Sequence, residues 1–148
     1  MGDLGEIFSH NRMSDIYGVS LEQLNEVWPE VEPHLQRALD YDGNRMDLPD
    51  VYWAVRLESM QLFVAVRGQD IHAAAVTEIL KYPNAKVLRC VYAGGTDVLE
   101  ALHFSDTLEE GARLRGCSQL EIIGRPGWER ILTGYKRTHV TLRKIVCG

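Results

Sequence analysis

The sequence predicts one α+β domain, in which helices flank a mixed and mainly antiparallel central sheet. Two observations support this prediction. Apolar residues recur at helical spacing in the first fifty residues, and from Gln61 the period changes to two, which is typical of strands. A glycine turn at residues 93–96 then precedes a second helical pattern, which is followed by a further apolar run. Helices before and after a run of strands favour layers built around one sheet.

The N-terminal region begins with a segment that has no periodicity. We interpret residues 1–13 as a loosely held arm and residues 14–148 as the folded domain. We expect a short strand at Ser14–Val19. Ser20 is a typical N-cap residue, and Gln23, three positions later, completes the capping box of a helix.

Two prolines divide the first helical pattern. Its apolar stripe reaches Trp28, and Pro29 and Pro33 follow closely. Because proline removes a backbone donor and clashes with the preceding turn, we expect a break or kink near Trp28 and a second helical piece after it. Asp47 then caps the next short helix, with Pro49 in its first turn.

Alternating residues in the middle of the chain predict antiparallel strands. Gln61–Val66 and Ile71–Leu80 are separated by the turn Arg67–Asp70, which is the pattern of a hairpin. A further turn leads to Ala85–Tyr92, which we expect to be the third strand of the same series.

The last third of the chain returns to mixed patterns. The glycine turn at 93–96 opens a helix that runs to about Arg115, and Gly116 has the position of a C-cap glycine. Three elements are expected after it: a buried strand, a short helix and an alternating strand (Leu120–Ile123, Trp128–Leu132 and Arg137–Val146).

Composition is that of an ordinary globular domain. The 148 residues are 45% hydrophobic and 25% charged, and no apolar run approaches the roughly 20 residues that cross a bilayer. The N-terminus lacks the basic and apolar regions of a signal peptide. Cys90, Cys117 and Cys147 are odd in number and widely spaced, which favours reduced thiols and no disulfide framework. We therefore expect a soluble, intracellular protein.

Charge is distributed unevenly along the chain. Residues 1–50 carry eleven acidic and three basic side chains, whereas residues 111–148 carry two acidic and eight basic ones. The two regions either attract each other within the fold, or the basic region meets phosphates, nucleic acid or an acidic neighbour in an assembly. There is no specific nucleic-acid motif, and the five histidines show no metal-ligand spacing, so no metal is expected.

Several short motifs carry a resemblance to a known family. They are Val27-Trp28-Pro29, Gln61–Val66, Ala74–Ile79 with Tyr82-Pro83, Ala93–Gly95, Ala112-Arg113 with Gly116-Cys117, Gly124–Trp128 and Gly134-Tyr135. The order of elements resembles the GNAT acetyltransferase fold. The motifs together are similar to a GNAT-like family encoded by bacteriophages and prophages. This resemblance implies a protein of the bacterial host cytoplasm or of the phage virion, with phage structural proteins or a second copy as partners.

The resemblance also implies acetyl-CoA as cofactor and an amine as substrate. Gly94, Gly95 and Thr96 occupy the place of the pyrophosphate loop, where backbone N–H groups at a helix N-terminus meet phosphates. The spacing departs from the usual Q/R-x-x-G-x-G/A, and Asp97 adds a carboxylate to the first helical turn. The alternative is that the glycines form only a strand-to-helix turn. We therefore expect a degenerate cofactor site.

Acid–base catalysis in such an enzyme needs a base for the amine and an acid for the leaving thiolate. Glu78, placed within a strand, is the first base candidate, and the alternative is a solvated strand face. Tyr135 is the candidate acid, with a packing aromatic as the alternative, and Tyr92 is a further candidate.

Two functions from different classes remain open. The first is an acetyl-CoA-dependent N-acyltransferase. The second is a non-catalytic GNAT-like virion protein, an internal or connector component, that acts through protein–protein contacts. Fold alone does not decide between them, because function resides in sites.

Overall fold

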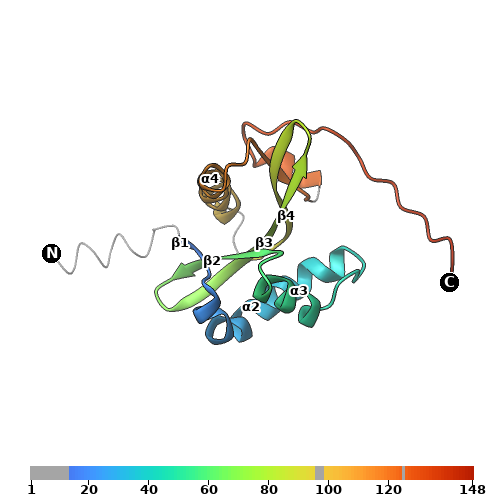
Figure 1. Cartoon of the computed structure of the whole chain (residues 1–148). Helices are drawn as coiled ribbons and strands as arrows, with labels where there is room; N and C mark the ends of the chain where they lie inside the picture. The colour runs from blue at the N-terminus through green and yellow to red at the C-terminus, as the bar shows by residue number, and fades with distance from the viewer. Residues whose placement is uncertain (1–13, 96–98, 125) are drawn as a thin grey trace.

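A five-stranded sheet lies at the centre of the structure, which is a computed structural model and describes residues 14–95, 99–124 and 126–148 (Figure 1). Within these residues the strands follow the order β1-β2-β3-β4-β5, with neighbours in sequence also neighbours in space. Their bounds are β1 Asp15–Gly18, β2 Gln61–Arg67, β3 Asp70–Tyr82, β4 Ala85–Gly95 and β5 Gln119–Ile122. β1 to β4 pair antiparallel, and β5 pairs parallel with β4. The predicted mixed, mainly antiparallel sheet is confirmed.

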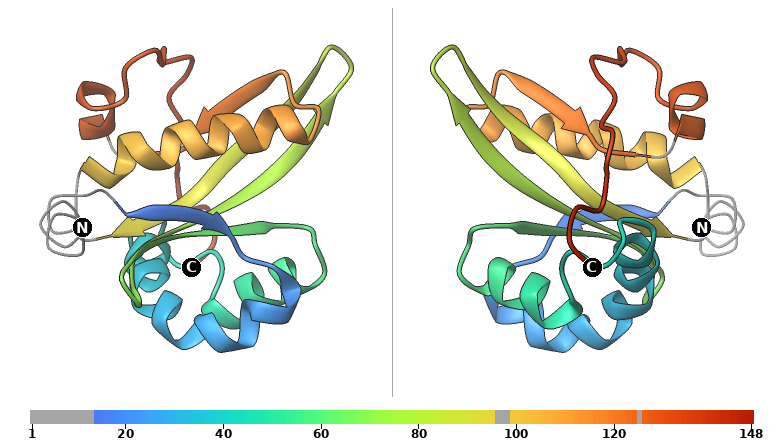
Figure 2. Two further views of the ribbon diagram at one scale, coloured as in Figure 1. Left: turned by 90° about the vertical axis from the view of Figure 1, so that its left-hand side faces the viewer. Right: turned by 90° about the vertical axis from the view of Figure 1, so that its right-hand side faces the viewer.

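Helices cover both faces of this sheet (Figure 2). α2 (Leu21–Tyr41) and α3 (Leu48–Arg56) pack on one face, which we call the α2 face, and α4 (Leu99–Leu114) packs on the other, the α4 face. A short 3₁₀ helix, η1 (Pro126–Arg130), follows β5. Side chains alternate between two cores, so that Val76 joins the α2 face and Ala75 the α4 face. The predicted α+β layering is confirmed.

Local signals placed several boundaries correctly. In α2 the Ser20 N–H and the Gln23 side-chain oxygen are 3.4 Å apart, as the capping box requires. Before α3 the Asp47 N–H donates to Asp50 at 2.9 Å. Gly116 follows α4 with φ +73°, a left-handed conformation that glycine adopts without steric cost.

The expected break near Trp28 is wrong, because α2 continues as one helix from Leu21 to Tyr41 with Pro29 and Pro33 inside it. Two interior prolines cost about 3 kcal/mol each. Fully buried apolar side chains contribute about 1.5–3 kcal/mol each, and α2 supplies four at 0% exposure (Leu24, Val31, Leu35 and Leu39). Packing against the sheet therefore offsets the local penalty, which sequence periodicity alone does not reveal.

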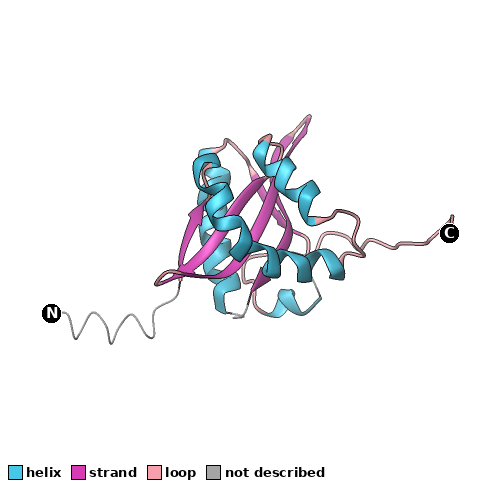
Figure 3. Cartoon of the chain, turned by 90° about the horizontal axis from the view of Figure 1, so that it is seen from below, coloured by secondary structure: helices cyan, strands magenta, loops and turns pink. Residues whose placement is uncertain are grey.

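The C-terminal segment also differs from its prediction. Among residues 131–148, which the structure describes in full, there is no helix or strand, so the strand expected at Arg137–Val146 is absent. Residues 132–141 lie beside α4, β5 and η1, and the C-terminal end of the segment extends away from the sheet and helices as a loop (Figure 3). An alternating segment forms a strand only when it pairs with another strand, and no described strand pairs with this one.

Candidate functional site

The two parallel strands of the sheet separate partway along their length. β4 and β5 pair from Val87 with Gln119 to Cys90 with Ile122, and the Ile123 N–H still donates to the Cys90 carbonyl at 3.0 Å. β4 then continues for five residues, 91–95, that pair with no described residue on the β5 side. The separation leaves a wedge between the strands, with backbone polar groups along one side.

A bulge in β4 begins where this separation begins. Thr77 of β3 pairs with Cys90, but the preceding Val76 pairs with Tyr92, so that Val91 is the extra residue. Bulges twist and bend a strand and are frequent beside functional sites. Here the bulge turns β4 away from β5 at the last paired residue.

The predicted phosphate-site glycines lie at the end of β4, and α4 begins four residues later at Leu99. A Cβ added at Gly94 would lie 2.1 Å from the His34 carbonyl oxygen, and one at Gly95 would lie 2.5 Å from the Ala73 Cβ. Both glycines therefore permit close packing of β4 against α2 and β3. Thr96, the third residue assigned to this site, lies outside the described residues.

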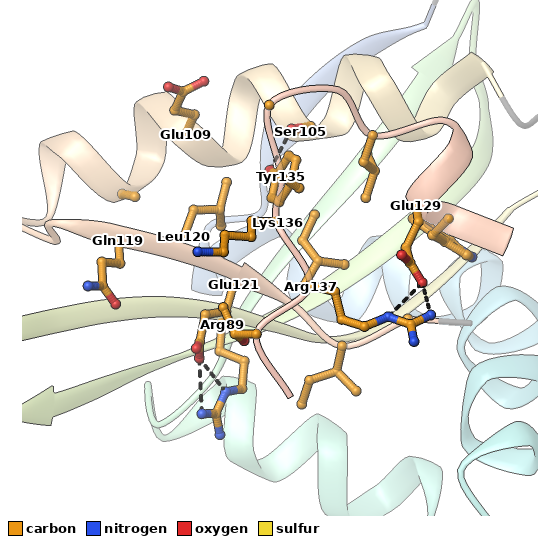
Figure 4. A pocket seen from close by; sticks show the side chains of 18 of the residues that line it. Arg89, Ser105, Glu109, Gln119, Leu120, Glu121, Glu129, Tyr135, Lys136 and Arg137 are labelled. Atoms are coloured by element: carbon orange, nitrogen blue, oxygen red, sulfur yellow. Dashed lines mark hydrogen bonds and ion pairs between the residues drawn. The ribbon is translucent and has the colours of Figure 1, made fainter. Parts of the chain in front are cut away.

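Tyr135, the predicted acid, lies on the α4 face. Its hydroxyl is 2.6 Å from the Ser105 Oγ of α4, and Figure 4 shows the two side chains meeting above β5. Burial raises the pKa of Tyr135, while the hydrogen bond with Ser105 lowers it in part. The phenol is thus protonated at neutral pH.

Glu78, the predicted base, lies in a row of charges across three strands. Arg89 is 3.7 Å from Glu78 and 3.0 Å from Glu121, and the three residues are direct neighbours in the sheet register. Burial alone would lower the pKa of Arg89, but the hydrogen bonds and charges of Glu121 and Tyr82 raise it. The row lies on the α2 face, because Glu78 is two positions after Val76. The structure therefore places Glu78 and Tyr135 on opposite faces and does not bring them together.

A second cluster of polar side chains lies on the α2 face, and of its members the sequence had indicated only Tyr92. The Tyr92 hydroxyl donates to Asp42 at 3.4 Å, and Arg143 donates to the Asp42 carbonyl oxygen at 2.8 Å. Burial and the Asp42 carboxylate, with a smaller effect from Glu78, raise the pKa of Tyr92. Asp42 and Arg143 are a hundred residues apart, so no local signal indicates their contact.

A cavity of about 1420 Å³ opens beside β5, and side chains from both faces of the sheet line it. It is lined by α4, β5, η1 and residues 132–141, and Tyr135 and Ser105 are among its walls (Figure 4). Two ion pairs border it, between Arg89 and Glu121 and between Arg137 and Glu129.

The thiol of Cys90 is not a reactive group. Cys90 is fully buried, which raises the pKa of its thiol to about 12 and keeps it protonated. In the described part of the chain, no group of three or more potential metal ligands occurs, and no helix is long and apolar enough to cross a membrane.

Comparison with solved structures identifies the fold. An aminoglycoside acetyltransferase from an uncultured soil metagenomic sample superposes with a TM-score of 0.67 at 9% identity, covering 90% of this chain and 96% of its own. A GNAT family acetyltransferase from Staphylococcus aureus gives 0.64 at 10% identity, with 91% and 100% covered. A ribosomal-protein-alanine N-acetyltransferase from Brucella melitensis gives 0.60 at 15% identity, with 88% and 99% covered. No protein-family model matches the sequence, and no curated protein matches it.

These similarities establish a GNAT-like α+β fold in a single domain, as the element order predicted. Identities of this size show the fold and leave the chemistry to the site itself.

Proposed function

We propose that this protein is an N-acyltransferase that uses acetyl-CoA to modify an amine. The observation that supports the proposal is the separation of β4 from β5 after Cys90, directly ahead of α4. Ligands of sheets with parallel strands bind beyond the carboxyl ends of those strands, where neighbouring strands diverge. Structural neighbours whose names describe acetyltransferases share the overall fold, which supports the proposal.

The free edge of β4 suits an extended ligand that contains amides. A peptide-like chain adds to an exposed strand edge through backbone hydrogen bonds, and the pantetheine arm of acetyl-CoA has two such amides. Residues 91–95 supply the edge. We assign the pyrophosphate to the N-terminal end of α4, with Gly94, Gly95 and Thr96 as its residues, because helix N-termini favour phosphate.

The chemistry requires two proton transfers. Acetyl-CoA supplies a thioester, whose acetyl group passes to the amine nitrogen as the carbon–sulfur bond breaks. Tyr135, held by Ser105, would serve as the proton donor to the departing sulfur. Glu78, or a water bound to it, would accept the proton that the amine loses. Because the two side chains lie on opposite faces, the amine approaches from the α2 face, where the Glu78, Asp42 and Tyr92 oxygens lie.

Thermal unfolding with acetyl-CoA tests the proposal. A ligand at 100 times its dissociation constant stabilises the fold by about 2.7 kcal/mol, which raises Tm by roughly 5–10 °C for a domain of this size. Release of free thiol on addition of a panel of polyamines, aminoglycosides and peptides then identifies the acceptor class. Unchanged unfolding at millimolar acetyl-CoA would contradict the proposal.

A second proposal is a non-catalytic component of a phage particle with a degenerate cofactor site. One observation favours it: Gly94 and Gly95 are explained by their packing against His34 and Ala73, without any ligand. The phage or prophage context rests on the motif resemblance. In this case acetyl-CoA leaves Tm unchanged, and the purified chain binds a protein from the assembled virion.

A further inference from the structure

The C-terminal tail, which we define as residues 136–148, passes from one side of the sheet to the other. Its first part, up to Thr141, lines the cavity beside α4, β5 and η1. Two residues later, Arg143 contacts Asp42, which directly follows the last residue of α2. In Figure 2 the tail runs from the side of η1 and α4 toward α2 and α3. The tail therefore connects the two helical layers without pairing with any described strand.

Arg143 is seated on the turn between α2 and α3. Its Nη1 donates to the Asp42 carbonyl oxygen at 2.8 Å, and its Nη2 lies 3.4 Å from the Asp42 Oδ1. Gly43, at φ +82°, lets the guanidinium lie close to the backbone, since a Cβ at this position would be 3.0 Å from Nη1. A carbonyl oxygen, a carboxylate and a glycine turn together form a seat that suits a cation with N–H donors.

Asp42 connects this seat to the free edge of β4. Its other carboxylate oxygen, Oδ2, accepts a hydrogen bond from the Tyr92 hydroxyl at 3.4 Å. Tyr92 belongs to the five residues of β4 that pair with no described residue on the β5 side. The seat of Arg143 is thus one tyrosine side chain away from the strand edge that the proposed function assigns to acetyl-CoA. It lies on the face from which the amine approaches.

The contact between Arg143 and Asp42 is of a kind that another cation can displace. The two side chains are 40% and 31% exposed, and ion pairs this exposed contribute little to stability. Beyond Arg143, Ile145 and Val146 are 76% and 84% exposed, so their packing does not hold the end of the tail in place. The seat is nevertheless occupied, because a tethered group has a high effective concentration.

We propose that the tail is an autoinhibitory strap, in which Arg143 occupies the place on Asp42 that a cation of the acceptor takes. This inference rests on the proposed function, and it names the acceptor class: an amine on a basic peptide, with a second cation beside it. The peptide character follows from the occupant, which is itself a basic segment of chain outside any helix or strand. A guanidinium stays protonated and offers no free amine, so Arg143 is an unreactive substitute. The tail thereby lowers the apparent affinity for the acceptor.

Binding of a basic peptide tests the seat without any acyl transfer. The probe is a fluorescein-labelled tetra-arginine peptide, measured by fluorescence anisotropy with the full chain and no acetyl-CoA. Arg143→Ala should bind the probe about two- to fivefold more tightly than the natural chain, because one exposed ion pair no longer competes. Lys144→Ala is the matched control, since it removes the same charge one residue away, and it should bind the probe as the natural chain does.

Asp42→Asn assigns the effect to the seat. This variant keeps the shape of the side chain and an oxygen for the Tyr92 hydroxyl but removes the charge. In the Asp42→Asn background, Arg143→Ala should lose most of its effect on probe affinity, because both changes act on one contact. Equal affinity of Arg143→Ala and the natural chain overturns the proposal. An equal gain in Lys144→Ala also overturns it, because the tail then acts only through its net charge.

Thiol release from acetyl-CoA separates this inference from the proposed function. With a peptide that carries one lysine beside an arginine, Arg143→Ala should lower KM for the peptide by the same factor and leave kcat unchanged. A KM that does not move while the peptide is acetylated overturns the autoinhibition and leaves the acyltransferase proposal intact. Acetyl-CoA that leaves Tm unchanged overturns the acyltransferase proposal, whereas the anisotropy measurement still decides whether Arg143 occupies a cation seat.

Discussion

The close approach of α2 to β4 at Gly94 leads to a sharp prediction. A methyl group at this position would lie 2.1 Å from the His34 carbonyl oxygen and 3.0 Å from its carbon. Because ordinary contacts are about 3.5 Å or longer, α2 and β4 would have to separate by about 1 Å or more in the Gly94→Ala variant. The oxygen belongs to helix backbone, which cannot rotate away as a flexible side chain would.

The energetic cost follows from what α2 buries. Leu35 directly follows His34 and Leu39 lies in the next turn; both are fully buried, so any displacement of the helix loosens the core of the α2 face. Overpacking of this kind costs about 1–3 kcal/mol and occasionally more. We expect Gly94→Ala to lose about 3 kcal/mol, which lowers Tm by roughly 6–12 °C.

Calorimetry or urea unfolding measures this loss, and Gly127→Ala is the matched control. A methyl group at Gly127 meets nothing within 4 Å, so the control should unfold within about 0.5 kcal/mol of the natural protein. If Gly94→Ala is as stable as the control, the proposed packing role of this glycine is refuted. The same geometry means that larger substitutions at Gly95 would test folding rather than cofactor binding, since Ala73 occupies the space.

Three further predictions concern the proposed chemistry and the buried thiol. Tyr135→Phe removes the hydrogen bond to Ser105, at a stability cost of about 1 kcal/mol. The variant should lower kcat at least tenfold and leave KM for acetyl-CoA unchanged. An unchanged kcat excludes Tyr135 as the acid. Glu78→Gln weakens a partly exposed ion pair with Arg89, so the free energy of unfolding should change by less than about 1 kcal/mol. The kcat of this variant should fall. A kcat equal to that of the natural protein excludes Glu78 as the base. Burial raises the pKa of the Cys90 thiol to about 12, so the stabilising effect of the buried, protonated thiol is complete below pH 9 and is lost as pH rises from 9 to 12. In urea unfolding, Cys90→Ala should make the free energy of unfolding fall less steeply over this pH range. Equal slopes for the variant and the natural protein contradict the burial argument.

The elements that the sequence predicted well are those that local chemistry specifies. Asp47 and Ser20 satisfy backbone donors within four residues, and Gly116 ends α4 at a left-handed position, so each boundary is readable from adjacent side chains. The hairpin of β2 and β3 follows from alternation and a short turn. These features need no knowledge of distant parts of the chain.

The features that the sequence did not reveal depend on contacts between distant residues. α2 remains unbroken because its apolar stripe meets the sheet, which outweighs the prolines at 29 and 33. The segment Arg137–Val146 carries a strand pattern, but in the described part of the chain it pairs with no strand.

The candidate site shows the same division. The sequence indicated Glu78 and Tyr135 as polar residues of interest, but not the ion pair of the first with Arg89 or the bond of the second with Ser105, thirty residues away. It indicated the glycines at the end of β4, but not the close approach of the His34 carbonyl oxygen and the Ala73 Cβ that explains them. The sequence gives the type of each residue, whereas the position of a proton donor relative to a strand edge depends on the whole fold.

Hydrogen exchange with and without acetyl-CoA tests the central claim most directly. The proposed function places the ligand along the free edge of β4 after Cys90, so the amides of residues 91–95 should become protected when acetyl-CoA is added, while those of β1 and β2 remain unchanged. Exchange rates at 91–95 that do not respond to saturating acetyl-CoA would contradict the assignment of this wedge as the acyl-CoA site.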